Sequence, residues 1–258
     1  MSTVLAFTDR LSDSPFVDRV WRSRSEQGGP FVSIAQSHFE IAVTRHRGRT
    51  SVTLRGPETV ATAAECPSEG EWLGIRFRLG TFMPRLIPGT LKDRHDVTLP
   101  EATSRSFWLD GSAWEYPDFE NADTFVARLV RKGIVARDFA VEAKLQRPLQ
   151  LPLRSAQRHF VRATGITHQK LRQIERARFA TMLLQEGVPI LDTVHEAGYF
   201  DQPHLTRALK TLVGATPAEI SRRTHQLSFL YKTTPLPPLY DAHGGSVHDR
   251  IGSNRRPR

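Results

Sequence analysis

The sequence predicts an α+β N-terminal domain with a β-rich body, a small sheet or barrel, followed by an all-α domain of two helix-turn-helix subdomains joined by a linker helix. Three observations predict this class. Short apolar runs separated by Gly, Pro and Ser turns occupy residues 16–100. Apolar residues recur at helical spacing from residue 151 to 225. Most of the excess positive charge lies in the last two-fifths of the chain.

The N-terminal strands are predicted by runs of apolar and β-branched residues. These runs are HFEIAV at 38–43, TSVTL at 50–54, TVATA at 59–63 and LGIRFRL at 73–79. We assign residues 1–120 to a β-rich domain. Residues 121–150 are predicted to form connecting helices, because Phe125 and Leu129, then Phe139, Ala143 and Leu145, fall near a period of 3.6.

The distribution of charge indicates a polyanionic partner for the C-terminal part. Residues 1–150 hold 20 Lys and Arg against 19 Asp and Glu, whereas residues 151–225 hold 11 against 6. The whole chain has a formal net charge of +9. An evenly basic surface fits this asymmetry poorly, so we expect residues 151–225 to bind nucleic acid.

Composition also excludes several classes of protein. No apolar run approaches the roughly 20 residues of a membrane-spanning helix. The start, MSTVLAFTDRLSD, lacks the apolar core of a secretory signal, so we expect a cytoplasmic protein with no membrane partner. The single cysteine, Cys66, excludes an intrachain disulfide, and its context AECPSEG predicts a loop.

Residues 190–217 carry consistent signals of a helix-turn-helix unit. Ile190, Val194 and Ala197 give one apolar face to a short helix, and Gly198 can adopt the positive φ that ends it. Asp201 is a natural N-cap for the helix that follows, in which Pro203 suits the first turn. The run TPAE at 216–219 predicts a capping box that opens one more helix.

The helix after Asp201 has the properties of a recognition helix. Leu205, Ala208, Leu209 and Leu212 are predicted to face inward. This leaves five polar or basic side chains near the outer surface, which are Gln202, His204, Thr206, Arg207 and Lys210. Such side chains can meet base edges in the major groove, while Lys210 can meet phosphate.

A less regular unit lies upstream. Its supporting helix is expected around Phe139 to Leu145, and its recognition helix over residues 154–162. Phe160 is predicted to point inward, with Gly165 closing the helix. Four side chains are predicted to point outward, namely Arg154, Gln157, Arg158 and Arg162.

Between the two units, residues 168–186 can form one continuous helix. Its apolar stripe consists of Leu171, Ile174, Ala177, Ala180 and Leu184. A helix of this length spans on the order of 28 Å. Successive major-groove faces on one side of B-DNA lie about 34 Å apart, so a rigid helix could hold two recognition helices in adjacent grooves.

Residues 151–222 resemble the DNA-binding domain of the AraC/XylS family of bacterial transcription regulators. The resemblance rests on the stretches RHFVRATGIT and RARFATMLLQEGVPILDTVHEAGYFDQPHLTRALKTLVGATPAEISR. It implies two helix-turn-helix subdomains joined by a central helix. It also implies that two sets of side chains face DNA, which are Arg154, Gln157 and Arg158 in the first unit and Gln202, His204, Thr206 and Arg207 in the second.

The N-terminal domain more faintly resembles the sensor domains attached to this module, through LGIRFRLGTFMPRL and LKDRHDVTLPE. We therefore predict a transcription factor whose residues 151–225 bind double-stranded DNA. RNA polymerase, a small-molecule effector and a second copy of the chain are its further candidate partners. The tail at 226–258 is rich in Pro and Gly and is expected to be disordered.

Two other classes remain open. One is an enzyme linked to DNA binding, such as an alkyl-transfer repair regulator acting through Cys66, although no nucleophile motif surrounds this cysteine. The other is a protein-interaction domain whose DNA module has lost its affinity. His38, His46 and His95 match no metal-ligand spacing, so we expect no metal, no cofactor and no enzymatic activity.

Overall fold

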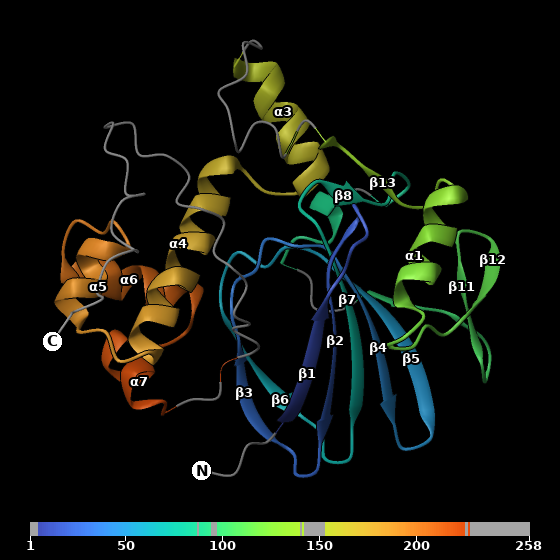
Figure 1. Ribbon diagram of the computed structural model, residues 1–258, viewed down its shortest axis with the longest axis horizontal. Helices are drawn as coiled ribbons and strands as arrows, with labels where there is room; N and C mark the ends of the chain where they lie inside the picture. The colour runs from blue at the N-terminus through green and yellow to red at the C-terminus, as the bar shows by residue number, and fades with distance from the viewer. Residues whose placement is uncertain are drawn as a thin grey trace, which may run out of the picture.

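The computed structural model describes residues 5–86, 88–93, 97–139, 141, 153–224 and 227. A β-rich N-terminal part lies beside a helical C-terminal part (Figure 1). The predicted fold class is confirmed, with sheets first and helices after them.

A six-stranded antiparallel sheet forms the body of the N-terminal part, with the strand order β1-β2-β7-β4-β5-β9. Three smaller sheets pair β3 with β6, β8 with β13, and β11 with both β10 and β12. The strands are β1 (Leu5–Leu11), β2 (Val17–Ser25), β3 (Gly29–Ser33), β4 (Glu40–His46), β5 (Arg49–Arg55), β6 (Thr62–Cys66), β7 (Glu71–Phe77), β8 (Thr81–Phe82), β9 (Val97–Leu99), β10 (Glu101–Thr103), β11 (Ser106–Leu109), β12 (Ser112–Glu115) and β13 (Ala136–Arg137).

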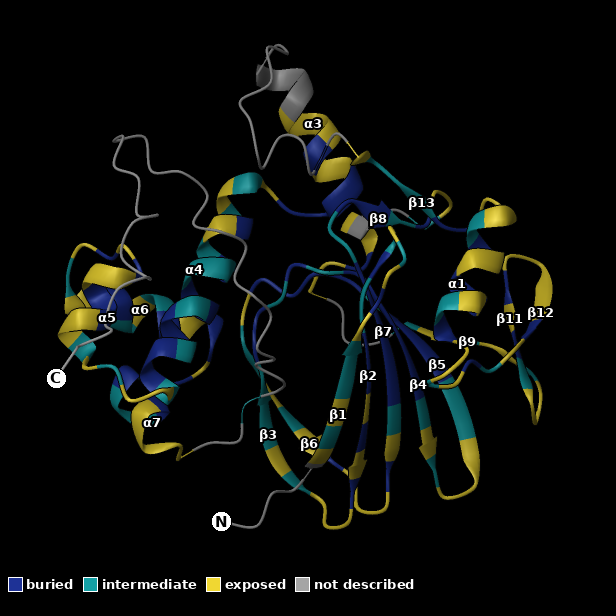
Figure 2. Ribbon diagram, viewed as in Figure 1, coloured by how far each residue is buried: buried dark blue, intermediate teal, exposed yellow. Residues whose placement is uncertain are grey.

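The core of this part lies between one face of the large sheet and helix α1 (Ala122–Arg131). Alternate residues of a strand point to one face, and Ile41 on β4 and Ile75 on β7 are both fully buried there. Phe125 and Leu129 of α1 join the same cluster. Figure 2 shows the buried residues concentrated along β2, β7, β4 and β5.

Helix α1 lies within the segment 121–150 that was predicted to form connecting helices, but residues 136–137 of this segment form a strand. Helix α1 ends at Arg131, and Gly133 follows with φ +70°. The chain then extends into β13, whose Ala136 pairs with Phe82 of β8, so sheet pairing replaces the helix there. Phe139 is exposed, while Ala143 and Leu145 lie outside the described residues.

The predicted loop around Cys66 is also wrong at this residue. Cys66 is the last residue of β6, pairs with Gly29 and is buried. Strands β1, β2 and β3, and the short strands from β8 to β13, were not among the predicted runs. The polar residues within RSRSEQGGP also concealed the end of β2, in which Ser23 and Ser25 alternate inward and are buried.

The C-terminal part is helical, as predicted. Its helices are α3 (Leu153–Thr164), α4 (His168–Gln185), α5 (Ile190–Glu196), α6 (Gln202–Leu212) and α7 (Pro217–Arg222). Helix α4 contacts all four others. Figure 1 shows α3 at one end of α4 and the group of α5, α6 and α7 toward its other end.

The two parts contact each other directly. The amides of Ala35 and Ala61 donate hydrogen bonds to the carbonyl oxygens of Leu212 and Thr211, at 2.7 and 2.9 Å. The Ser37 hydroxyl donates to Oε1 of Glu175 on α4 at 2.8 Å. Since Thr211 and Leu212 end α6, the N-terminal part holds the C-terminus of this helix.

Of the expected C-terminal tail, only Leu227 lies within the described residues. It forms an isolated bridge with Val32 of β3. The remaining residues of the segment 226–258, on which the expectation of disorder falls, lie outside the described part.

Candidate nucleic-acid interface

The second predicted helix-turn-helix unit consists of α5, the turn at residues 197–201 and α6. Gly198 has φ +67°, and its amide donates to the His195 carbonyl oxygen at 3.1 Å, which ends α5 as predicted. The Asp201 carboxylate accepts a 2.7 Å hydrogen bond from the amide of His204 and so caps α6. The predicted capping box of Thr216 and Glu219 opens α7.

Helix α6 buries one face and exposes the other. Leu205 and Leu209 are fully buried and Leu212 is nearly so, as the periodicity predicted. Gln202, Arg207 and Lys210 are exposed. His204 and Thr206 are half-buried: the His204 ring meets Tyr199 edge-on, and the Thr206 hydroxyl donates to the Gln202 carbonyl oxygen at 2.9 Å.

Residues of the turn before α6 are held in place by Arg176 of α4. Its Nη1 donates to the Gly198 carbonyl oxygen at 3.1 Å, and its guanidinium lies 4.5 Å from the centre of the Tyr199 ring. Tyr199 is buried, and this burial raises the pKa of its phenol although Arg176 acts in the opposite direction. The linker helix therefore fixes the turn from which α6 begins.

The helix predicted to be the first recognition helix is α3. Phe160 is buried and packs edge-on against His168, while Gly165 ends the helix at φ +78°. Gln157, Arg158 and Arg162 are exposed, and Arg154 lies in the first turn with its side chain outside the described part. Most of the expected supporting helix around Phe139 to Leu145 also lies outside it. Helix α3 contacts β8 and the 3-10 turn Pro88–Thr90 of the N-terminal part.

Helix α4 is the predicted linker helix and ends within one residue of the predicted boundary. The whole predicted stripe is fully buried, namely Leu171, Ile174, Ala177, Ala180 and Leu184. The Thr167 side chain accepts from the Lys170 amide at 3.1 Å and caps its start. A buried stripe along a capped helix makes α4 a stiff connection between α3 and α6.

Acidic residues are absent from the sequences of both recognition helices. Neither LRSAQRHFVRAT of α3 nor QPHLTRALKTL of α6 contains Asp or Glu. The supporting helix α5, in contrast, contains Asp192 and Glu196. The cationic side chains are therefore placed on the helices that a polyanion would meet.

Residues 146–223 match the family model described as "Helix-turn-helix domain". This segment is therefore a helix-turn-helix domain. The match supports DNA binding by residues 146–223, in agreement with the resemblance found in the sequence. The positions of the base and phosphate contacts stay predictions.

Two solved structures are similar to the chain, with low sequence identity and low TM-scores. One is ToxT from Vibrio cholerae, at 12% sequence identity and a TM-score of 0.34, covering 84% of this chain and 98% of that one. The other is an apo lysine-to-alanine variant of ToxT from Vibrio cholerae strain SCE256, at 12% identity and a TM-score of 0.36, covering 83% and 99%. No curated protein sequence matches the chain.

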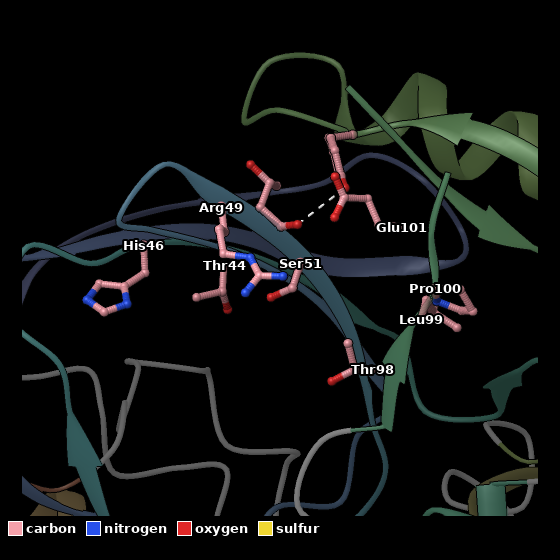
Figure 3. A pocket seen from close by; sticks show the side chains of 10 residues that line it. Thr44, His46, Arg49, Ser51, Thr98, Leu99, Pro100 and Glu101 are labelled. Carbon is pink, nitrogen blue, oxygen red and sulfur yellow. Dashed lines mark hydrogen bonds between the residues drawn. The ribbon is translucent and has the colours of Figure 1, made fainter. Parts of the chain in front are cut away.

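The N-terminal part contains a polar hollow of about 600 Å³ beside the β4–β5 hairpin (Figure 3). Its lining is Thr44, His46, Arg49, Thr50, Ser51, Thr98, Leu99, Pro100, Glu101 and Tyr116. The Tyr116 hydroxyl donates to the Thr50 carbonyl oxygen at 3.3 Å. His46 Nε2 is buried with no hydrogen-bond partner among the described residues, so it could bond to a small polar ligand.

A second hollow of about 620 Å³ lies where β1 and β7 begin and β2 and β4 end. Arg22, Arg24 and Arg45 line it together with Glu71, Asp118 and Glu120. The Arg22 guanidinium stacks over the Phe119 ring, at 4.6 Å from the centre of the ring. This balance of charges does not select an anion.

The structure gives no support to catalysis by Cys66. Its side chain is buried and lies 3.6 Å from the Pro67 carbonyl oxygen. Burial raises the pKa of the thiol, against a smaller opposite effect of Ser25, and so disfavours the nucleophilic thiolate. The alkyl-transfer alternative therefore has no activated nucleophile at this position.

The described ranges contain neither a cluster suited to a metal ion nor a helix suited to crossing a membrane. There, no three His, Cys, Asp or Glu side chains gather where they could hold a metal ion. His38 and His46 lie in the N-terminal part, and His95 falls outside the described residues. In the same ranges, none of the helices has the length and apolar character needed to cross a membrane.

Proposed function

We propose that one protomer binds duplex DNA by placing α3 and α6 in adjacent major-groove segments. The observation that carries this proposal is the stiff helix α4, which joins two helices whose exposed faces contain no carboxylate. Its 18 residues span about 27 Å. Because α3 and α6 lie at the two ends of α4 (Figure 1), the distance between them can match adjacent major-groove segments, which recur about every 34 Å.

Within each recognition helix we assign base contacts and phosphate contacts to different side chains. Arg154, Gln157 and Arg158 in α3, and Gln202, His204, Thr206 and Arg207 in α6, are the proposed base-reading residues. Arg162 and Lys210 lie farther along these helices and are proposed to contact phosphate. The half-buried positions of His204 and Thr206 make Gln202 and Arg207 the leading candidates in α6.

Selection from a random duplex pool tests the proposal. The purified full chain is expected to enrich a site with two conserved segments whose centres lie about 10 bp apart. The variant Arg158→Ala should relax preference in one segment, and Arg207→Ala in the other. Enrichment of a single short segment by the wild-type protein would show that only one unit reads DNA.

We further propose that the N-terminal part controls the position of α6. The support is the pair of amide hydrogen bonds from Ala35 and Ala61 to the last two carbonyls of this helix. The effector is proposed to be a small polar molecule that binds in the hollow beside His46, whose lining offers hydroxyl, imidazole and guanidinium groups.

Hydrogen exchange tests this coupling without knowledge of the effector. Coupling between two sites is reciprocal, so DNA binding must change the protection of the N-terminal part. We expect slower exchange at the amides of Ala35 and Ala61, and a smaller change around His46, when the selected duplex is added. Unchanged exchange throughout residues 5–137 in the DNA-bound protein would mean that the parts are uncoupled.

A further inference from the structure

Phe200 is an exposed aromatic residue directly before the second recognition helix. Its relative exposure is 90%, which exceeds that of every other large exposed hydrophobic residue in the described part of the chain. A single exposed apolar residue is common on a protein surface. Phe200, however, lies two residues before Gln202, at the N-terminal end of α6.

Phe200 lies in a turn whose other residues are fixed. The preceding Gly198 and Tyr199 are both held by Arg176, through the carbonyl oxygen and the ring respectively. The following Asp201 caps α6 through the His204 amide at 2.7 Å. These contacts on both sides fix the backbone around Phe200, whose side chain is exposed to solvent. Because the backbone is already ordered, binding of a partner to Phe200 would cost little further backbone entropy.

A purely local role does not account for this side chain. A hydrophobic residue before an N-cap commonly packs against the fourth residue of the helix, which is Leu205 here. Leu205 is fully buried, whereas Phe200 is almost fully exposed, so the two do not form such a contact. The exposure of Phe200 leaves its apolar surface for a partner.

The surroundings favour DNA as that partner. The N-terminal residues of a recognition helix are those that meet base edges, and Phe200 adjoins that end of α6. Within α6, no large apolar residue is exposed, so Phe200 does not continue into an apolar patch along this helix. An isolated ring beside Gln202 and Arg207 matches the major groove, where the thymine C5-methyl group is the apolar feature of the base edges.

We propose that Phe200 reads a thymine methyl group at the edge of the site recognised by α6. This inference rests on the proposed function, because α6 must enter the major groove for the contact to form. It adds a specificity-determining residue that supplies apolar contact where its neighbours supply hydrogen bonds. Its effect is a preference for thymine over cytosine or uracil at one position.

Thymine-to-uracil scanning of the selected duplex tests this contact, since each replacement removes one methyl group and leaves base pairing intact. We would measure affinities of the wild type, Phe200→Ala and Leu191→Ala by fluorescence anisotropy. Leu191 is a matched control, because it is 63% exposed in the same unit but lies on the supporting helix α5. Circular dichroism should show unchanged folding for both variants.

The proposal predicts that wild-type affinity falls about fourfold for uracil at one position, the expected effect of one buried methyl group. Phe200→Ala should weaken binding to the thymine duplex by at least this factor and be insensitive to uracil there. Leu191→Ala should retain the wild-type response.

Three results would overturn it. Equal affinity of Phe200→Ala and the wild type for the thymine duplex, while Arg207→Ala weakens binding, removes Phe200 from the interface and leaves the proposed function intact. A loss in Phe200→Ala that persists equally with uracil at every position shows a contact other than a methyl group. Failure of the wild type to select any duplex would refute the proposed function itself.

Discussion

The amide of Ala35 in the N-terminal part donates a 2.7 Å hydrogen bond to the carbonyl oxygen of Leu212, the last residue of α6. Carbonyl groups in the last turn of a helix have no partner within that helix. Here the N-terminal part supplies the partner, and Ala61 does the same for Thr211. Helix α6 is thus completed by residues at least 150 positions away in the sequence, so its placement depends on both parts.

Replacing Gly214 by Ala is expected to loosen this contact. Gly214 has φ +78°, and an added Cβ would lie 2.8 Å from Cγ1 of Val32 in β3. The backbone strain alone costs about 1–2 kcal/mol, and the close approach adds to it. Gly187→Ala is the matched control, because Gly187 has φ +88° but nothing within 4 Å of the added Cβ. Exchange of the Ala35 and Ala61 amides should accelerate only in Gly214→Ala; identical behaviour of the two variants would argue against the contact.

Replacing Asp201 by Ala is expected to weaken both stability and DNA binding. The variant loses the side-chain cap on the His204 amide, which costs about 0.5–2 kcal/mol of unfolding free energy. Asp201→Asn keeps a capping oxygen and should retain most of the stability. Denaturant unfolding and anisotropy binding curves measure the two effects. A loss as large in Asp201→Asn as in Asp201→Ala would assign it to the charge and not to the cap.

Replacing Arg207 by Ala is expected to cost about 1–3 kcal/mol of specific binding if its guanidinium reads a base. Arg207 is exposed on α6, so its removal should leave folding unchanged. Arg158→Ala is expected to act similarly through α3, whereas Arg105→Ala, on an exposed turn of the N-terminal part, should have no effect. Gel-shift titrations on the selected site decide this. Wild-type affinity in both Arg207→Ala and Arg158→Ala would refute these placements.

Replacing Lys210 or Arg162 by Ala should reduce the salt dependence of binding with little change in sequence preference. Each phosphate contact contributes about 0.9 to the slope of log affinity against log salt concentration. Affinities measured across a range of NaCl concentrations give this slope for wild type and variants. A variant that keeps the wild-type slope but prefers a different sequence would identify its side chain as a base reader.

Acidification is expected to weaken the contact between the two parts through His38. Burial, and then the charges of Arg76 on β7 and Arg178 on α4, lower the pKa of this imidazole well below its ordinary value. Because the folded-state pKa is lower than the unfolded one, the unfolded state takes up the proton first, and stability falls as the pH drops below about 6.5. Thermal unfolding at pH 7 and pH 5 should show a larger loss for the wild type than for His38→Gln. An equal loss of thermal stability in the wild type and in His38→Gln would show that His38 does not cause this pH dependence.

Much of the helical region was predictable because its signals are local. The N-cap Asp201, the capping box at Thr216 and the glycines at 165 and 198 act within a few residues of themselves, and the structure places each as expected. The buried stripe of α4 follows from helical periodicity alone. In the N-terminal part, apolar runs identified β4, β5 and β7; the large apolar residues alternate in β5 and β7, whereas the apolar residues of β4 are consecutive.

The remaining features depend on contacts between distant residues. Residues 136–137 form a strand because β8 is available to pair with them, and no local signal shows this. In the turn before α6, Tyr199 is buried with its ring against Arg176 of α4, whereas the neighbouring Phe200 is exposed, and this difference follows from tertiary packing. The close approach of Gly214 to Val32 likewise follows only from the tertiary arrangement.

The central claim is that one protomer engages two neighbouring major-groove segments through α3 and α6. Hydroxyl-radical footprinting of the wild-type protein on its selected duplex tests it most directly. The account predicts two protected windows on one face of the duplex, centred about 10 bp apart, with Arg158→Ala weakening one and Arg207→Ala the other. A single window, lost in Arg207→Ala and unaffected in Arg158→Ala, would contradict it.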